Sequence, residues 1–255
     1  MEQTIAQLPP LFLFAAYAVF WGWEAFYAAR PRPGQRARRV RNLALSAICI
    51  VIAAASGTAV LWLSAVAARE HWGLVQWLEV PIAPACVAGV ILLDLTDYLR
   101  HRLSHAVPLL WSLHRVHHSD LAVDVTTSLR NHPIEILLRP LFLAATIIAF
   151  GIAPLAVLLQ PLLQLPILVF QHANVRLPPA LDRVLAWAIV TPGMHLVHHS
   201  RMRPEADSNY STFLTLWDRL FGSFRPAKAP DAIGIDGFDQ PRNQTLLGLL
   251  ATPFQ

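Results

Sequence analysis

Long apolar runs are the feature that most limits what this chain can fold into. Three of them, 8–29, 42–68 and the stretch that begins near Ile82, have about the length that crosses a bilayer as a helix, roughly 20 residues. Only 14% of the residues are charged, against roughly 25% in an average soluble domain. A bilayer core has no water to satisfy backbone groups, so continuous runs of this kind cross it as helices. The sequence therefore predicts an all-α integral membrane protein.

A fourth apolar block, 134–170, predicts a hairpin of two short helices that is broken around Gly151–Pro154. Three further prolines should kink or shorten these helices: Pro140, Pro161 and Pro166. A single long tilted helix is the alternative. The expected fold is thus a helical bundle with about three spans plus a short re-entrant or spanning hairpin. Segment 178–190 has apolar residues at helical spacing and is expected to lie along the membrane interface.

The positive charge of the chain is concentrated in one loop. Segment 30–41 holds six arginines next to an apolar run, which indicates a cytoplasmic loop and makes nucleic acid an improbable partner. The N-terminus then lies outside, and the run at 8–29 is a retained span because it lacks the features of a cleaved signal peptide. Span three ends at the cytoplasmic face. Cys49 and Cys86 lie in apolar runs and fit buried small residues better than a disulfide.

A histidine triplet occurs twice. WSLHRVHHSD at 111–120 and GMHLVHHSRM at 193–202 share the core H-x-V-H-H-S. Positions i, i+3 and i+4 of a helix lie on one face, so each triplet directs three imidazoles to the same side. HRLSH at 101–105 does the same with two imidazoles at i and i+4. Neutral imidazole binds zinc, iron, copper and nickel, so the spacing predicts a metal centre.

Ten of the eleven histidines are expected at the cytoplasmic face, as a histidine-rich helical cap, and only His71 falls on the other side. Ten imidazoles exceed what one metal binds, so two metals with four or five nitrogens each fit better. His132 and His172 are isolated, and the sequence alone leaves ligation and a structural hydrogen bond equally open for them. The ten candidates are His101, His105, His114, His117, His118, His132, His172, His195, His198 and His199.

Several polar residues near the histidines are candidates for orienting them. Asp94, Asp97 and His101 lie on one stripe of span three, where ionisable residues are costly and usually functional. A carboxylate there could accept the second N–H of a ligating imidazole. The alternative for Asp97 is a structural ion pair with Arg100 or Arg102. Downstream, the corresponding candidates are Asp207, Asn209 and Asp218, with ordinary loop and capping roles as the alternative.

The ordered set DLTDYLRHRLSH, LHRVHHS, RNHPIE, QHANV, TPGMHLVHHS and DSNYSTFLTLWDRLFGSF resembles the fatty acid hydroxylase / sterol desaturase superfamily over roughly residues 90–225. These are integral-membrane, non-haem di-iron enzymes. The resemblance implies a site ligated by His101, His105, His114, His117, His118, His172, His195, His198 and His199, with His132 as a further candidate. It also implies a di-iron domain over 81–225, between N-terminal helices at 1–80 and a tail at 226–255. One departure is Ser211, where the family expects glycine after Asn-Tyr.

The resemblance further implies the chemistry. Two iron ions use O₂ and external electrons to hydroxylate, or desaturate, an unactivated C–H bond, and the protein positions the substrate and excludes water. Hydroxylation of a lipid or sterol-like substrate is favoured over carotenoid chemistry. The electron donor is expected to be a separate ferredoxin, cytochrome b5 or reductase, since no fused cytochrome b5 region is visible. A bacterial inner membrane is the expected location, with the endoplasmic reticulum as the alternative.

Other classes of membrane protein fit the pattern less well. A metal transporter or metal-sensing protein would favour ligands along a path through the spans, whereas these clusters gather at one face. A membrane zinc hydrolase is disfavoured because no H-E-x-x-H occurs. A degenerate, structural family member is disfavoured by the intact histidine set.

Overall fold

The computed structural model describes residues 8–30 and 35–255, and within these ranges the protein is helical, with two isolated β-bridges and no strand. The predicted all-α class is confirmed. The elements are, in chain order, α2 (Leu8–Tyr27), α3 (Gln35–Arg69), α4 (Leu74–Trp77), α5 (Ile82–Ala106), α6 (Pro108–His118), η1 (Val125–Thr127), α7 (Pro133–Phe150), α8 (Pro154–His172), α9 (Pro179–Leu185), α10 (Pro192–His198), α11 (Arg203–Ala206), α12 (Leu216–Leu220), α13 (Leu246–Ala251) and η2 (Thr252–Phe254).

Four helical stretches are long and apolar enough to cross a membrane: Arg36–Trp77, Ile82–Ala106, Pro133–Phe150 and Pro154–His172. The predicted hairpin supplies two of them, as α7 and α8, and the single tilted helix is ruled out. The apolar run at 8–29 forms α2 but is not among the four, because its prolines, tryptophans and Glu24 lower its mean hydropathy. The bundle therefore has four candidate spans, with α2 packed alongside them.

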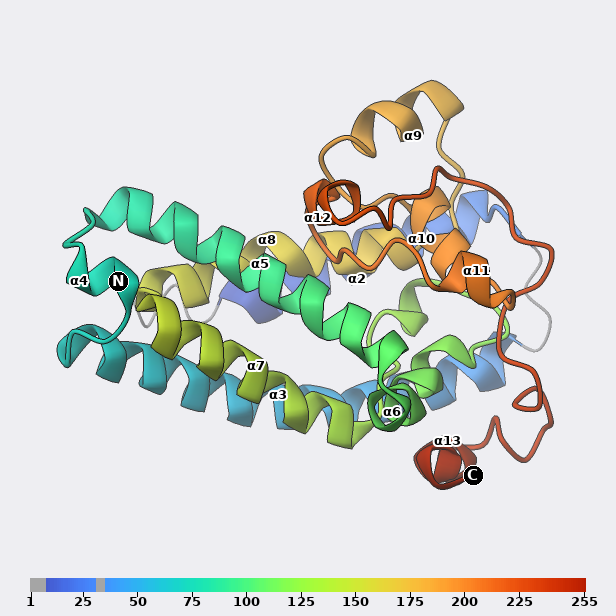
Figure 1. Ribbon diagram of the computed structural model, residues 1–255. Coiled ribbons are helices and arrows are strands. Elements are labelled where there is room, and N and C mark those ends of the chain that lie inside the picture. Colours follow the sequence, from blue (N-terminus) through green and yellow to red (C-terminus); the bar gives the residue numbers. More distant parts are fainter. Residues whose placement is uncertain (1–7, 31–34) are drawn as a thin grey trace.

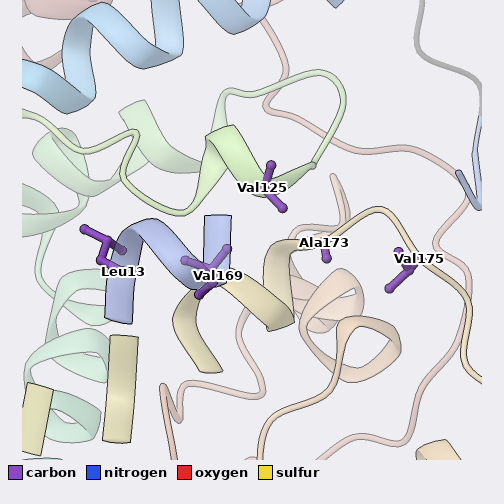
Figure 2. Packing of buried hydrophobic residues seen from close by; sticks show 6 residues of the cluster. Leu13, Val125, Val169, Ala173 and Val175 are labelled. Carbon is purple, nitrogen blue, oxygen red and sulfur yellow. The ribbon is translucent and has the colours of Figure 1, made fainter. Parts of the chain in front are cut away.

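The long helices run along a common axis (Figure 1). The principal pairs are α3 with α7, α2 with α8, and α5 with both hairpin helices. One apolar cluster joins α2, α8 and the loop around η1 through Leu13, Val125, Val169, Ala173 and Val175 (Figure 2). This packing holds the end of α8, and therefore His172, against the rest of the bundle.

The turn between α7 and α8 fits closely against the connection between α3 and α5. Gly151 ends α7 in the left-handed conformation, with φ of 69°, and Gly73 has φ of 84°. A Cβ atom on Gly73 would lie 2.1 Å from the Gly151 nitrogen, and one on Gly151 would lie 2.3 Å from the Trp72 carbonyl oxygen. The two backbones therefore meet at a distance that only glycine permits.

Substitution of Gly151 by alanine should destabilise the fold by at least about 1–3 kcal/mol, since it adds backbone strain to a direct clash. Thermal unfolding of the detergent-solubilised protein measures the change. Gly57→Ala is the matched control, because Gly57 lies within α3 with no atom within 4 Å of an added Cβ. The control should be neutral or stabilising by about 0.5–1 kcal/mol. Equal unfolding temperatures for the two variants would contradict the close approach.

The arginine-rich start of α3 lies at the same end of the bundle as the histidines. Arg38 donates to Asp120 at 2.8 Å and also contacts Asp124, just beyond the first triplet. Glu24, near the end of α2, accepts from the backbone nitrogen of Asn174 at 2.6 Å, just beyond His172. His71 lies at the opposite end, in the α3–α4 turn, and is exposed. The shared end agrees with the predicted topology; its cytoplasmic orientation stays a prediction.

Candidate metal centre

Four helices carry the predicted ligand motifs. HRLSH lies at the end of α5, the first triplet at the end of α6, the second triplet on α10 and its C-cap, and His172 at the end of α8. The TPG sequence explains the start of α10: Thr191 is its N-cap and accepts from the Met194 nitrogen at 3.3 Å, and Pro192 occupies the first turn. Both features favour helix initiation at this point.

Nine histidines converge at these helix ends in two groups, and within each group one ligand atom per residue lies within 4.8 Å of all the others. All nine are buried. The five-histidine group consists of His101, His105, His114, His118 and His198, and the four-histidine group of His117, His172, His195 and His199. Two groups of four and five nitrogens match the arrangement that the histidine count predicts.

Each triplet is divided between the two groups. His114 and His118, which are separated by four residues, stay together, whereas His117 joins the other group. In the second triplet His195 and His199 stay together and His198 crosses over. Each triplet thus supplies both groups, which explains why two copies serve one two-centre site.

The five-histidine group directs its Nε2 atoms inward, because four of its rings are held at Nδ1 by acceptors. The Nδ1 atom of His101 donates to the Tyr210 carbonyl at 2.7 Å, and that of His198 to the Ser208 carbonyl at 2.7 Å. The Nδ1 atom of His114 lies 2.7 Å from a Glu135 carboxylate oxygen. Since a neutral imidazole has one N–H, these bonds place the proton on Nδ1 and leave a lone pair on each Nε2.

Those lone pairs face one another. The Nε2 atom of His101 lies 3.0 Å from Nε2 of His114 and 3.0 Å from Nε2 of His198. Three electron pairs directed at one another at this distance repel unless a cation lies among them. The donor set therefore fits a metal ion that accepts nitrogen ligands, such as iron or zinc.

Protonated imidazoles do not provide that cation. Burial, followed by the charge of neighbouring imidazoles, holds the pKa of His117, His118, His195 and His199 well below the ordinary value. For His198 burial and the neighbouring His114 lower the pKa to about 3. These five rings are therefore neutral at physiological pH, which is the form that binds metals.

Two carboxylates flank the five-histidine group. Glu135 contacts His114, as described, and Asp207 lies 3.1 Å from Nδ1 of His105. Asp207 was predicted for this position and Glu135 was not, although it stands three residues after His132 in RNHPIE. Arg100 lies 3.3 Å from Glu135 and balances its charge. Carboxylate partners of this kind orient a ligating imidazole and raise its basicity.

The four-histidine group has fewer hydrogen-bond partners at its Nδ1 atoms. The Nδ1 atom of His172 donates to the Leu168 carbonyl at 2.7 Å, one turn earlier in α8. The Nδ1 atoms of His117, His195 and His199 are buried and have no hydrogen-bond partner among the described residues. Its ligands are therefore held by packing more than by hydrogen bonds.

His132 lies outside both groups. Its Nδ1 accepts from the Ile134 nitrogen at 3.2 Å and caps the start of α7, while Nε2 donates to the Leu250 carbonyl at 3.2 Å. Both ring nitrogens are thus occupied by the backbone. The structure assigns His132 a capping contact rather than a place among the converging nitrogens.

We predict that His132→Ala keeps the metal content of the wild type and lowers stability by about 0.5–2 kcal/mol, the usual range for loss of a helix cap. His172→Ala is the comparison, because it removes a converging nitrogen and should lower the metal content. Elemental analysis of both purified variants measures the difference. A loss of metal from His132→Ala as large as that from His172→Ala would contradict the assignment.

The remaining predicted polar residues act at a distance from the rings. The carboxylate of Asp97 pairs with Arg139 at 2.7 Å and with Arg100 at 3.6 Å and accepts from Gln164, and among the described residues it makes no hydrogen bond to His101. Asp94 instead accepts from Trp217 Nε1 at 2.8 Å. Asp97 therefore links α5 to α7 and α8, and Asp94 links α5 to α12.

Asp218 and Asn209 organise the loop that follows the second triplet. Asp218 accepts from the backbone nitrogens of Tyr210 and Ser211 at 2.8 and 3.0 Å. It thereby fixes the peptide whose carbonyl accepts the hydrogen bond from Nδ1 of His101. Asn209 has a positive φ of 52° and bonds the Met194 and Arg225 carbonyls. Ser211, which replaces the glycine expected here, is fully buried, and its backbone nitrogen donates to the Asp218 carboxylate.

Comparison with known proteins agrees with this arrangement. A sequence model of the fatty acid hydroxylase family matches residues 86–223, just over half of the chain. The chain belongs to the fatty acid hydroxylase family. The matched region includes all nine converging histidines.

The names of three relatives indicate that they act on lipids or sterols. An ornithine lipid hydroxylase of Rhizobium tropici is 30% identical over 241 residues, covering 88% of this chain and 67% of the relative. An alkylglycerol monooxygenase of Xenopus tropicalis is 35% identical over 56% of this chain and 31% of its own length. A cholesterol 25-hydroxylase-like protein of Danio rerio is 29% identical over 53% of each. The chain thus spans 31% to 67% of the length of these relatives, and no solved structure matches it.

Proposed function

We propose that the protein is a membrane-bound, non-haem di-iron oxygenase that hydroxylates an unactivated C–H bond of a membrane lipid. The observation that carries the proposal is the convergence of unprotonated imidazole nitrogens in two adjacent groups. Family membership supports the oxygenase class, because the relatives are named as hydroxylases or monooxygenases. The ornithine lipid hydroxylase, which covers most of this chain, supports a lipid with a polar headgroup as the substrate.

The five-histidine group would hold one iron and the four-histidine group the other. Iron bound there would activate O₂, so that one oxygen atom is inserted into a C–H bond and the other is reduced to water by two external electrons and two protons. The residues of the chain hold five of the nine imidazoles in one orientation with the proton at Nδ1, through the Tyr210, Ser208 and Leu168 carbonyls and two carboxylates. Burial of all nine rings excludes water from the site.

Partner and location follow from the same proposal. The electrons come from a separate ferredoxin, cytochrome b5 or reductase that approaches the end of the bundle where the histidines lie. That end faces the cytoplasm if the arginines of segment 30–41 obey the positive-inside rule. We place the protein in a bacterial inner membrane, with desaturation as the second outcome of the same chemistry.

The alternative, a metal transporter or metal-binding protein without redox chemistry, has less support. Transport needs ligands along a path through the spans, whereas both groups lie at one end of the bundle. No described histidine outside these groups, other than His132 and His71, is present to extend such a path.

Turnover under isotopically labelled O₂ tests the proposal. The iron-loaded protein in lipid vesicles is supplied with a reductase, a ferredoxin and a bacterial lipid extract, and the products are analysed by mass spectrometry. We expect a lipid that has gained one oxygen atom carrying the label. Label arriving from water, or no oxidised lipid despite full iron loading and reduction, would contradict the oxygenase assignment.

A further inference from the structure

Two segments around the second triplet form one unit on the side of the bundle. We call residues 179–190 and 213–221 the side lobe; it contains α9 and α12 (Figure 1). The backbone nitrogen of Val190 donates to the Phe213 carbonyl, and the Thr215 nitrogen to the Ala188 carbonyl, both at 3.2 Å. Arg219 donates to the Ala186 carbonyl at 2.8 Å. Backbone and side-chain hydrogen bonds therefore join the two segments into one unit.

The side lobe is attached to α5 well inside a candidate span. Asp94 of α5 accepts from Trp217 Nε1 at 2.8 Å and from the Leu214 nitrogen at 3.3 Å. One turn further along α5, the ring of Tyr98 stacks on Phe221 with centroids 5.4 Å apart. These contacts fix α12 against the flank of α5, between its middle and its histidine end.

The depth of this attachment follows from the helix rise. Asp94 stands 12 residues after Ile82, where the candidate span begins, or about 18 Å along the helix axis at 1.5 Å per residue. The hydrocarbon core of a bilayer is about 30 Å thick. Exposed Trp72 and Trp77 precede Ile82 and fit an interface at that end. Asp94 and Trp217 therefore lie within the core, about 10 Å deeper than His101.

The outer surface of the side lobe is apolar. Its exposed hydrophobic side chains are between 43% and 72% accessible, far more than a water-facing surface needs: Leu181, Val184, Trp187, Leu216, Leu220 and Phe221. The guanidinium of Arg219 covers the Trp187 ring at 4.0 Å, and Arg183 is exposed on α9. Tryptophan beside arginine is typical of the headgroup level, where arginine reaches the anionic lipid phosphates.

We propose that the side lobe is immersed in the membrane, with its apolar surface in contact with lipid and its arginines at the headgroups. The surface continues the lipid-facing flank of α5, and Asp94 is shielded beneath it at 1% exposure. The second triplet lies between the two segments of the lobe in sequence, so the lobe flanks α10 on both sides along the chain. This proposal concerns the lipid bilayer as partner and does not depend on the oxygenase chemistry.

Depth-resolved fluorescence quenching tests it in the full chain, reconstituted into phosphatidylcholine–phosphatidylglycerol vesicles. Val184→Cys and Leu220→Cys are labelled with bimane in a background that carries Cys49→Ala and Cys86→Ala. Val87→Cys, 61% exposed on α5, is the lipid reference, and Asp236→Cys, whose side chain is 83% exposed, is the water reference. The four labelled positions are exposed, whereas Cys49 and Cys86 are buried, so the metal content of the cysteine-free background and of each labelled protein is measured to confirm folding.

We expect both lobe positions to lose fluorescence in vesicles brominated on the acyl chains, as Val87→Cys does, and to be protected from iodide in the buffer. Quenching by iodide to the extent seen for Asp236→Cys, with little effect of brominated lipid, would overturn the proposal. That outcome leaves the metal centre and its activity intact, so it is distinguishable from a failure of the proposed function.

Discussion

Replacing His199 by alanine is expected to abolish lipid oxidation and to reduce bound iron by about one ion per chain. His199 belongs to the four-histidine group, and its Nε2 lies 3.2 Å from Nε2 of His195. Three nitrogens would then remain in that group. The loss should exceed the roughly 10- to 100-fold effect that is typical of residues outside the ligand set. Iron analysis and product formation are measured on the same preparation.

His71→Ala is the control for this change. His71 lies in the turn between α3 and α4, at the end of the bundle opposite to the site, and is exposed. His118→Ala provides the matching test for the five-histidine group, since Nε2 of His118 lies 3.1 Å from that of His105. Loss of iron from His71→Ala, or full iron and activity in both of the other variants, would contradict the arrangement.

Removal of the Glu135 carboxylate should selectively weaken the five-histidine group. Glu135→Ala deprives His114 of the acceptor that fixes its Nδ1 proton, so we expect about 10- to 100-fold weaker iron binding in that group. Glu135→Gln retains an acceptor oxygen and should restore part of this affinity. Iron release to a chelator, followed with Mössbauer spectra of the remaining iron, separates the two groups.

Glu205→Gln is the matched control for the Glu135 variants. Glu205 accepts from Ser200 and Lys228 and contacts no imidazole, although it lies close in sequence to Asp207. Unchanged iron release in Glu135→Ala, or an equal effect in Glu205→Gln, would show that the carboxylate has no positioning role.

The sequence predicts those features that depend on periodicity and charge. Apolar runs located the long helices, Gly151 marked the hairpin turn, and i, i+4 spacing kept His114 with His118. The first apolar run was harder, because its helix is 20 residues long but contains prolines and Glu24, which lower its mean hydropathy below that of the four candidate spans.

The partners of the imidazoles could not be predicted in the same way. Three are backbone carbonyls, at Leu168, Ser208 and Tyr210, and any residue type supplies a carbonyl. Glu135 was overlooked because its contact with His114 joins α7 to α6, a tertiary relation that sequence spacing does not encode. For Asp97, helical spacing suggested contact with His101, with an ion pair to Arg100 as one alternative; the carboxylate pairs with Arg100 at 3.6 Å and with Arg139 of another helix at 2.7 Å.

Iron content per chain, together with its Mössbauer spectrum, is the most direct test of the central claim. The protein is purified from cells grown with iron-57 and analysed for all transition metals. We predict close to two irons per chain, with spectra of two distinct environments, as expected for groups of five and four histidines that differ in their carboxylate neighbours. One metal or none per chain, or zinc at both positions in active protein, would contradict the di-iron account.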